Sequence, residues 1–231
     1  MKKTRIIKII VDLAMYILFL LLMGQHLISG AAHEWLGISL FAFFLLHNAL
    51  NYKWYAALFR GKYTANRVVQ TVVNFLLMIA MIGCVISSML ISGTVFAWLD
   101  LGGAEFGRKL HMLSTAWAFV LMSVHLGLHF SSFVSMARKM KLPATAKVIV
   151  KWLLRAMVLA IGIFDIVVFA RRAFYEELFL LTAFKFFDYE KTAFVYLLDT
   201  TAMSGSFVGM TYYLKKFCLI KKNNYKNGAT Y

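Results

Sequence analysis

Histidine is the residue type whose placement in this chain suggests chemistry. His33 and His47 are 14 residues apart in one apolar stretch, and His111 and His125 are 14 residues apart in another. On an α-helix, 14 residues turn about 1400°, within roughly 40° of four full turns, and rise about 21 Å. Each pair therefore lies on one helix face. Ionisable residues inside apolar helices are costly and are candidates for function, so the spacing predicts two levels of functional histidines.

Two histidines that face each other at one level suit a haem iron. One apolar stretch separates the two histidine-bearing stretches, so their helices would run parallel, with His33 level with His111. Neutral imidazole is a good iron ligand, and two imidazoles fill both axial positions of a haem. Zinc would need a third and a fourth ligand. The pattern predicts two stacked b-type haems that transfer electrons, and the predicted iron ligands are His33, His47, His111 and His125.

Two further residues are candidates for the same sites. His129 lies one turn beyond His125 on a similar face, so it is the alternative inner ligand, although the equal spacing favours His125. Arg108 is a candidate partner for the propionates of an outer haem, and the alternative is an ordinary interfacial charge. His26, near the end of the first apolar stretch, is expected to line the outer site or to donate a hydrogen bond.

Several other small or acidic residues near the histidines have two interpretations each. Gly37 and Gly127 would let a flat macrocycle approach a helix, but glycine is common in spanning helices anyway. Glu34 suits the positive end of a helix dipole, and proton or quinone handling is the alternative. Asp165 and Asp12 are intramembrane acids, and for Asp165 proton uptake competes with simple pairing.

Composition requires that these residues lie in a membrane protein. Of the 231 residues, 61% are hydrophobic and 15% are charged, with one proline. Soluble domains carry about 25% charged residues, and disordered chains are far less apolar. A spanning helix takes roughly 20 apolar residues. We expect an all-α, polytopic membrane helical bundle with about six spans, at 6–28, 33–59, 68–99, 108–136, 148–170 and 192–214, and an interfacial amphipathic segment at 171–191.

These elements form one predicted integral membrane domain over residues 1–231. Its haem-binding four-helix core covers about 6–136, and a C-terminal helix pair with the interfacial segment covers about 148–214. Most of the 25 Lys and Arg residues fall on the side of the N-terminus, which predicts cytoplasmic N- and C-termini in a multi-pass protein of the cell membrane. The same rule explains the net charge of +15 without nucleic-acid binding. The basic, apolar start is also typical of a signal peptide, but its length favours an uncleaved first span.

Three segments resemble a known family. HEWLGISLFAFFLLHNALNYKW (33–54), GRKLHMLSTAWAFVLMSVHLGLH (107–129) and FKFFDYEK (184–191) resemble the flavinylation-associated cytochromes, which are small bacterial membrane proteins. The resemblance implies haem ligands at His33, His47, His111 and either His125 or His129. It also implies electron transfer between the quinone pool and an extracytoplasmic flavoprotein. This chain lacks a D-x-x-S-G-A-[ST] flavin-attachment motif, so any flavin would belong to a separate subunit.

The sequence therefore predicts a transmembrane electron-transfer cytochrome with two haems, embedded in lipid and acting as the electron-transfer subunit of an oxidoreductase. The alternative is a haem-free transporter, or a proton or metal relay, that uses intramembrane His and Asp residues. That class explains buried histidines but not matched 14-residue pairs on parallel helices. A haem-free membrane anchor is a third class, and it needs no histidines in its spans.

Overall fold

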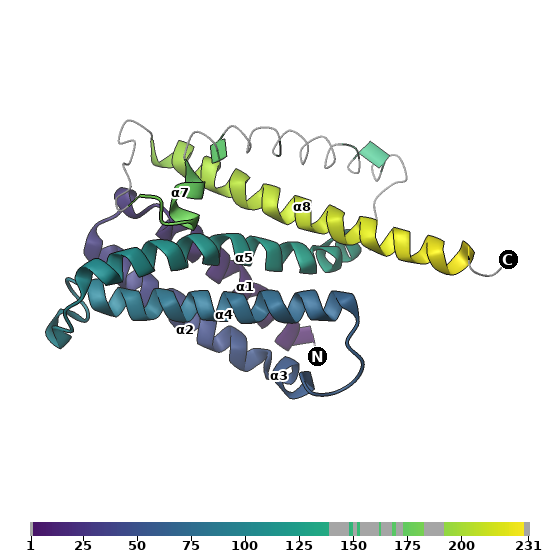
Figure 1. Ribbon diagram of the computed structural model, residues 1–231, viewed down its shortest axis with the longest axis horizontal. Helices are drawn as coiled ribbons and strands as arrows, with labels where there is room; N and C mark the ends of the chain where they lie inside the picture. Colours follow the sequence, from purple (N-terminus) through teal and green to yellow (C-terminus); the bar gives the residue numbers. More distant parts are fainter. Residues whose placement is uncertain are drawn as a thin grey trace.

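All regular secondary structure in the described part of the chain is helical (Figure 1). The computed structural model describes residues 2–138, 148–149, 152, 162, 168–169, 173–182 and 192–228. Its α-helices are α1 (Lys2–Leu22), α2 (Gly30–Leu50), α3 (Tyr52–Ala57), α4 (Ala65–Ile91), α5 (Ala104–Arg138), α7 (Phe174–Leu178) and α8 (Ala193–Gly228), and its short 3₁₀ helices are η1 (Gln25–Leu27) and η2 (Ala97–Leu99). A helical bundle, as predicted, is thus confirmed.

Three predicted stretches end earlier as helices than the apolar pattern suggests. The first, 6–28, is helical only to Leu22, after which the chain turns into η1. The second, 33–59, breaks at Asn51, whose side-chain amide donates to the His47 carbonyl at 2.9 Å and so caps α2. The third, 68–99, leaves the helix after Ile91, because the Ser92 hydroxyl accepts from the Phe96 backbone N–H at 2.8 Å and closes a turn.

The fourth and sixth predicted stretches correspond to longer helices of the structure. The fourth stretch, 108–136, lies within α5, and the sixth, 192–214, lies within α8, which continues to Gly228. Figure 1 shows this end of α8, in yellow, reaching beyond the end of α5. Most of the predicted span at 148–170 lies outside the described residues. Within the predicted interfacial segment, 171–191, the structure describes the five-residue helix α7.

Hydrogen bonds between helices fix their relative directions. α1 runs antiparallel to α2, α4 runs antiparallel to α5, and α5 runs parallel to α8. The pairs that show this are Lys8–Asn51 and Asp12–His47 for α1 with α2, Ser87–His111 and Asn74–His125 for α4 with α5, and Ser123–Ser204 and Leu128–Lys215 for α5 with α8. α1 with α2 and α4 with α5 therefore run antiparallel, whereas α8 points in the same direction as α5.

Small residues bring α4 and α5 together. A Cβ at Gly83 would lie 2.4 Å from the Ser114 hydroxyl, and one at Gly107 would lie 2.8 Å from the Leu90 Cβ. Each glycine thus removes the atom that would hold the helices apart, which is how helices in membranes pack closely. Since α4 carries the partners of His111 and His125, this close packing helps to position the site.

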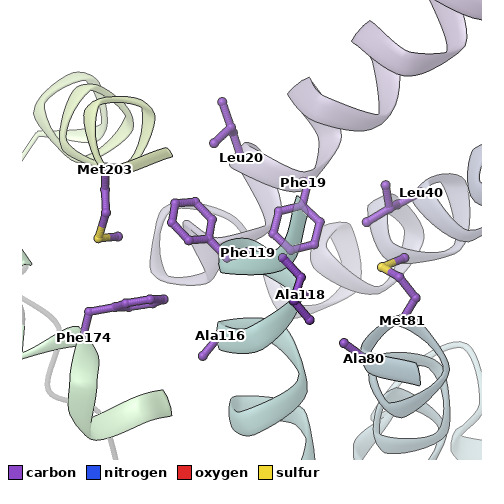
Figure 2. Close-up of a cluster of buried hydrophobic side chains, with 11 residues drawn as sticks. Phe19, Leu20, Leu40, Ala80, Met81, Ala116, Ala118, Phe119, Phe174 and Met203 are labelled. Atoms are coloured by element: carbon purple, nitrogen blue, oxygen red, sulfur yellow. The ribbon is translucent and has the colours of Figure 1, made fainter. Parts of the chain in front are cut away.

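The hydrophobic core lies around the middle of α5 (Figure 2). Phe119 is fully buried there, with its ring centroid 6.5 Å from that of Phe19 on α1 and 5.6 Å from that of Phe174 on α7. Met203 of α8 and Leu40 of α2 belong to the same cluster. Along α5, this cluster falls between the two predicted histidine levels, so apolar packing holds the bundle together between them.

Two of the described helices are long and apolar enough to cross a membrane. They are Ala65–Ile91 and the part of α5 over Ala104–Ser132, and only 22% and 39% of their most apolar windows are buried. The core helix of a soluble protein would be mostly buried. α1 falls short because it carries Arg5, Lys8 and Asp12 among its apolar residues, and α2 because His33 and Glu34 make it more polar.

Candidate functional site

The structure brings His33 of α2 and His111 of α5 together. Their ring centroids are 6.2 Å apart, with 71° between the ring planes. A metal–imidazole bond is about 2 Å long and a ring centre lies about 1 Å behind its nitrogen, so two imidazoles on opposite sides of one metal ion have centroids about 6 Å apart. The observed separation therefore suits a metal ion held between the rings. We call these two residues the His33–His111 pair.

The proton position on His111 follows from its hydrogen bonds. The Ser87 hydroxyl donates its one hydrogen to the Cys84 carbonyl oxygen at 2.9 Å. Its oxygen lies 3.0 Å from His111 Nδ1 and must therefore accept from that nitrogen. A neutral imidazole carries one proton, so His111 Nε2 has a free lone pair. This is the state that a metal ligand requires.

His33 has a ring nitrogen in need of a partner. Its Nδ1 is buried, and no hydrogen-bond partner for it is found in the part of the chain that the structure describes. Burying a polar atom without a hydrogen bond costs free energy, so such an atom calls for an explanation. A metal ion bound at this ring, or the tautomer that such binding selects, would provide one.

Glu34, next to His33, fixes the position of α2 against the end of α4. Its carboxylate accepts from the Ser92 hydroxyl at 2.7 Å and from three consecutive backbone N–H groups, those of Gly93, Thr94 and Val95, at 2.9, 3.2 and 2.7 Å. Charge-assisted bonds of this kind are the stronger class. This loop contact differs from the predicted roles at a helix dipole or in proton handling, and it holds His33 level with His111.

A second group of polar residues lies at the opposite end of the bundle. His47 Nδ1 donates to the Asp12 carboxylate at 2.7 Å. Lys8 donates to the side-chain oxygen of Asn51 at 2.8 Å, and the Asn51 amide is 3.4 Å from His47 Nε2. That last contact is long and weak. The lone pair of His47 Nε2 therefore remains available for a stronger partner.

His125 of α5 reaches the same end. Its Nδ1 donates to the Asn74 side-chain oxygen of α4 at 2.8 Å, so its Nε2 also has a free lone pair. His47 and Asp12 both lie within electrostatic range of His125. The His129 ring is 4.8 Å from the His125 ring, centroid to centroid, but the His129 side chain is more exposed. We call His47, His125, His129 and Asp12 the His47 cluster.

The two ends share one arrangement that suits haem iron. His47, His111 and His125 each donate from Nδ1 to a protein acceptor, which leaves Nε2 as the ligand atom. Metal-binding histidines almost always have such a second partner, because it fixes the tautomer and the ring orientation. Within the described residues, no group of three or more His, Cys, Asp or Glu side chains is placed to hold a metal ion. Two imidazoles per iron are what a six-coordinate haem takes from protein.

Some predicted contributors lie elsewhere. Gly127 faces α8, where a Cβ would lie 2.7 Å from Thr211, so its proposed approach to a macrocycle is wrong; Gly37 has open space around its Cβ position. Arg108 is exposed, one turn before His111. His26 lies in η1 with its ring 4.4 Å from that of Tyr196 on α8. Asp165 lies outside the described residues.

The sequence analysis missed the α4 partners of the α5 histidines. Ser87 and Asn74 lie in an otherwise apolar helix, where polar side chains need partners. Ser88 also approaches His111 Nδ1, at 3.5 Å, and it is 14 residues from Asn74. The signal was therefore the presence of polar side chains in an otherwise apolar helix.

Comparisons with known proteins place this chain in no family. No family model matches it, and no curated protein or solved structure is significantly similar to it.

Proposed function

We propose that this protein is a membrane-embedded b-type cytochrome that carries electrons between the two faces of a membrane through two haems. The observation that carries the proposal is the His33–His111 pair, with ring centroids 6.2 Å apart and His111 held through Nδ1. His33 and His111 would hold one haem, and His47 and His125 the other. Among the residues of the His47 cluster, His125 is favoured over His129 because Asn74 fixes its ring.

The haems, held by these histidines, would supply one-electron redox chemistry. The histidines of each helix are separated by about 21 Å along the axis. Two centres at these levels would divide the crossing of a hydrocarbon core of about 30 Å into short steps. The protein's own part is to hold each imidazole neutral, oriented and shielded from water.

Apolar side chains on the outer surface support the membrane location. α4 exposes a stripe that recurs every three or four residues, and α1 exposes a similar one. The residues are Val68, Val69, Val72, Leu76, Ile79, Ile82 and Ile86 on α4, and Ile6, Ile10, Leu13 and Ile17 on α1. A contiguous exposed apolar surface of this kind is unstable in water and suits contact with lipid.

The helix directions support six spans with both termini in the cytoplasm. α5 and α8 run parallel, and a crossing between them, as expected at 148–170, is what two parallel neighbours require. With the N-terminus inside, the His33–His111 pair lies near the outer face and the His47 cluster near the inner face. The basic residues then collect on the cytoplasmic side, as the positive-inside rule requires.

The partners in this proposal come from the resemblance to the flavinylation-associated cytochromes. Quinone would exchange electrons with the protein within the membrane, and a separate flavoprotein would exchange them at the outer face. The chain would then be the electron-transfer subunit of an oxidoreductase.

A reduced-minus-oxidised absorption spectrum, with haem quantified per chain, tests the proposal. We expect two low-spin b-type haems in the detergent-purified protein. His111→Ala and His47→Ala should each lose one haem. His26→Ala is the control, because the ring of this histidine packs on Tyr196 of α8, and it should keep both haems. A colourless protein from cells supplied with haem would overturn the proposal.

The Asp12–His47 hydrogen bond is the contact that favours the second candidate, a haem-free proton or metal relay. A relay would need that pair but not the His33–His111 pair. Proton or metal flux in vesicles containing the colourless protein, lost in Asp12→Asn and kept in His111→Ala, would support it.

A further inference from the structure

The histidines of the two sites are anchored by acceptors of different charge. His47 donates to a carboxylate, that of Asp12, at 2.7 Å. His111 donates to the Ser87 hydroxyl at 3.0 Å, and His125 donates to the Asn74 amide oxygen at 2.8 Å. Only one of these three hydrogen bonds therefore has an ionisable acceptor, and it belongs to the His47 cluster.

A carboxylate acceptor changes the ligand that it anchors. It draws the Nδ1 proton more strongly than a neutral oxygen does, which makes the other ring nitrogen a stronger electron donor. A stronger donor stabilises oxidised iron more than reduced iron, so it lowers the reduction potential. Hydroxyl and amide acceptors have the same effect to a smaller degree.

Other charged residues near the two sites reduce the electrostatic difference that Asp12 makes between them. Glu34 lies beside His33, but its carboxylate is held by four donors of the Ser92–Val95 loop rather than by an imidazole ring. Lys8 is one helical turn from Asp12, and the positive charge of Lys215 lies within electrostatic range of His129. These cations offset part of the Asp12 charge at a distance. The direct Asp12–His47 bond is thus the main asymmetry between the sites.

We propose that Asp12 is a positioning residue that makes the inner haem the lower-potential one of the two. This inference rests on the proposed function. Electrons would then run downhill from the cytoplasmic side, at the His47 cluster, to the outer side, at the His33–His111 pair. Each transfer moves one electron, oxidising the inner centre and reducing the outer one, and no bond forms or breaks.

Redox titration of single-haem variants tests the proposal. His111→Ala should retain only the inner haem, and His47→Ala only the outer one, so each midpoint potential can be assigned. We expect the inner midpoint to be the lower. Adding Asp12→Asn, which keeps an acceptor oxygen but removes its charge, should raise the inner midpoint. Asn74→Asp, which places a carboxylate on His125, should lower it.

The outer haem provides the control. In the His47→Ala background, Asn74→Asp should leave the outer midpoint almost unchanged. If Asp12→Asn prevents haem binding, the Asn74→Asp shift still decides whether a carboxylate acceptor sets the potential. An inner midpoint above the outer one, or one that neither variant moves, would overturn the inference and leave the dihaem assignment intact. Absence of haem from the unmodified protein would instead overturn the proposed function.

Discussion

At the scale of single residues, the proposed site depends on atoms that do not touch the cofactor. The Ser87 hydroxyl donates a hydrogen bond to the Cys84 carbonyl oxygen, which leaves the hydroxyl oxygen to accept from His111 Nδ1–H. Asn74 performs the same task for His125. Each therefore selects the tautomer whose Nε2 can bind a metal. Removing one of these acceptors leaves the ligand in place but frees its orientation.

Ser87→Ala should weaken haem binding at the His33–His111 pair without abolishing it. Loss of such a second partner costs about 10–100-fold in affinity at metal sites. Titration of the apo-protein with haem, followed by absorbance, measures the two affinities. Ser88→Ala is the matched control, because Ser88 lies 3.5 Å from the same nitrogen, at the limit of a hydrogen bond. Equal losses in the two variants would contradict the role given to Ser87.

At the scale of elements, α4 aligns the other helices. It packs closely on α5 through Gly83, and it carries the hydrogen-bond acceptors for His111 and His125. The loop after it holds Glu34 of α2. The Glu34 contact ties α2 to α4, and α4 in turn packs on α5. The relative height of α2 and α5, and hence the meeting of their histidines, is thus set by a helix that contains no histidine.

Glu34→Gln should loosen this connection. The amide of Gln has a single acceptor oxygen, so at least one donor of the partly exposed loop loses its partner, at a cost of about 0.5–1.5 kcal/mol. We expect a lower midpoint temperature in thermal unfolding of the detergent-solubilised protein and weaker binding of the outer haem. Glu105→Gln is the control, because its exposed side chain pairs only with Lys109 one turn away, and it should leave both quantities unchanged. An unchanged unfolding temperature in Glu34→Gln would contradict this role of Glu34.

The sequence predicted the histidine levels because helical periodicity is a local property. The 14-residue interval places His33 and His47 on one face whatever surrounds them. It could not predict Glu34 on the Ser92–Val95 loop, because that contact joins residues far apart in the chain. Nor were the helix ends predicted: the predicted stretches continue past Leu22 and Ile91 to apolar residues further on, whereas turns at the residues between them end the helices.

At the scale of the whole molecule, the proposed orientation assigns each loop to one side of the membrane. The loop between α3 and α4 should face the cytoplasm, and the loop between α4 and α5 should face outward. In a background without Cys84 and Cys218, Lys62→Cys should react with an impermeant thiol reagent only in inverted vesicles. Leu101→Cys should react in intact cells, since both side chains are exposed. Labelling of both positions from the same side would contradict the topology.

The contact between Glu34 and its loop also has a consequence for biogenesis. Its four donors follow it by 58 to 61 residues in the chain. Glu34 is synthesised before these donors, so its carboxylate would be solvated by water or by lipid headgroups until α4 and the loop after it are in place. His33 waits longer still, for His111. In the proposed arrangement, the site at the His33–His111 pair would therefore be completed late in translation, and haem could be loaded there only after α5 had entered the bilayer.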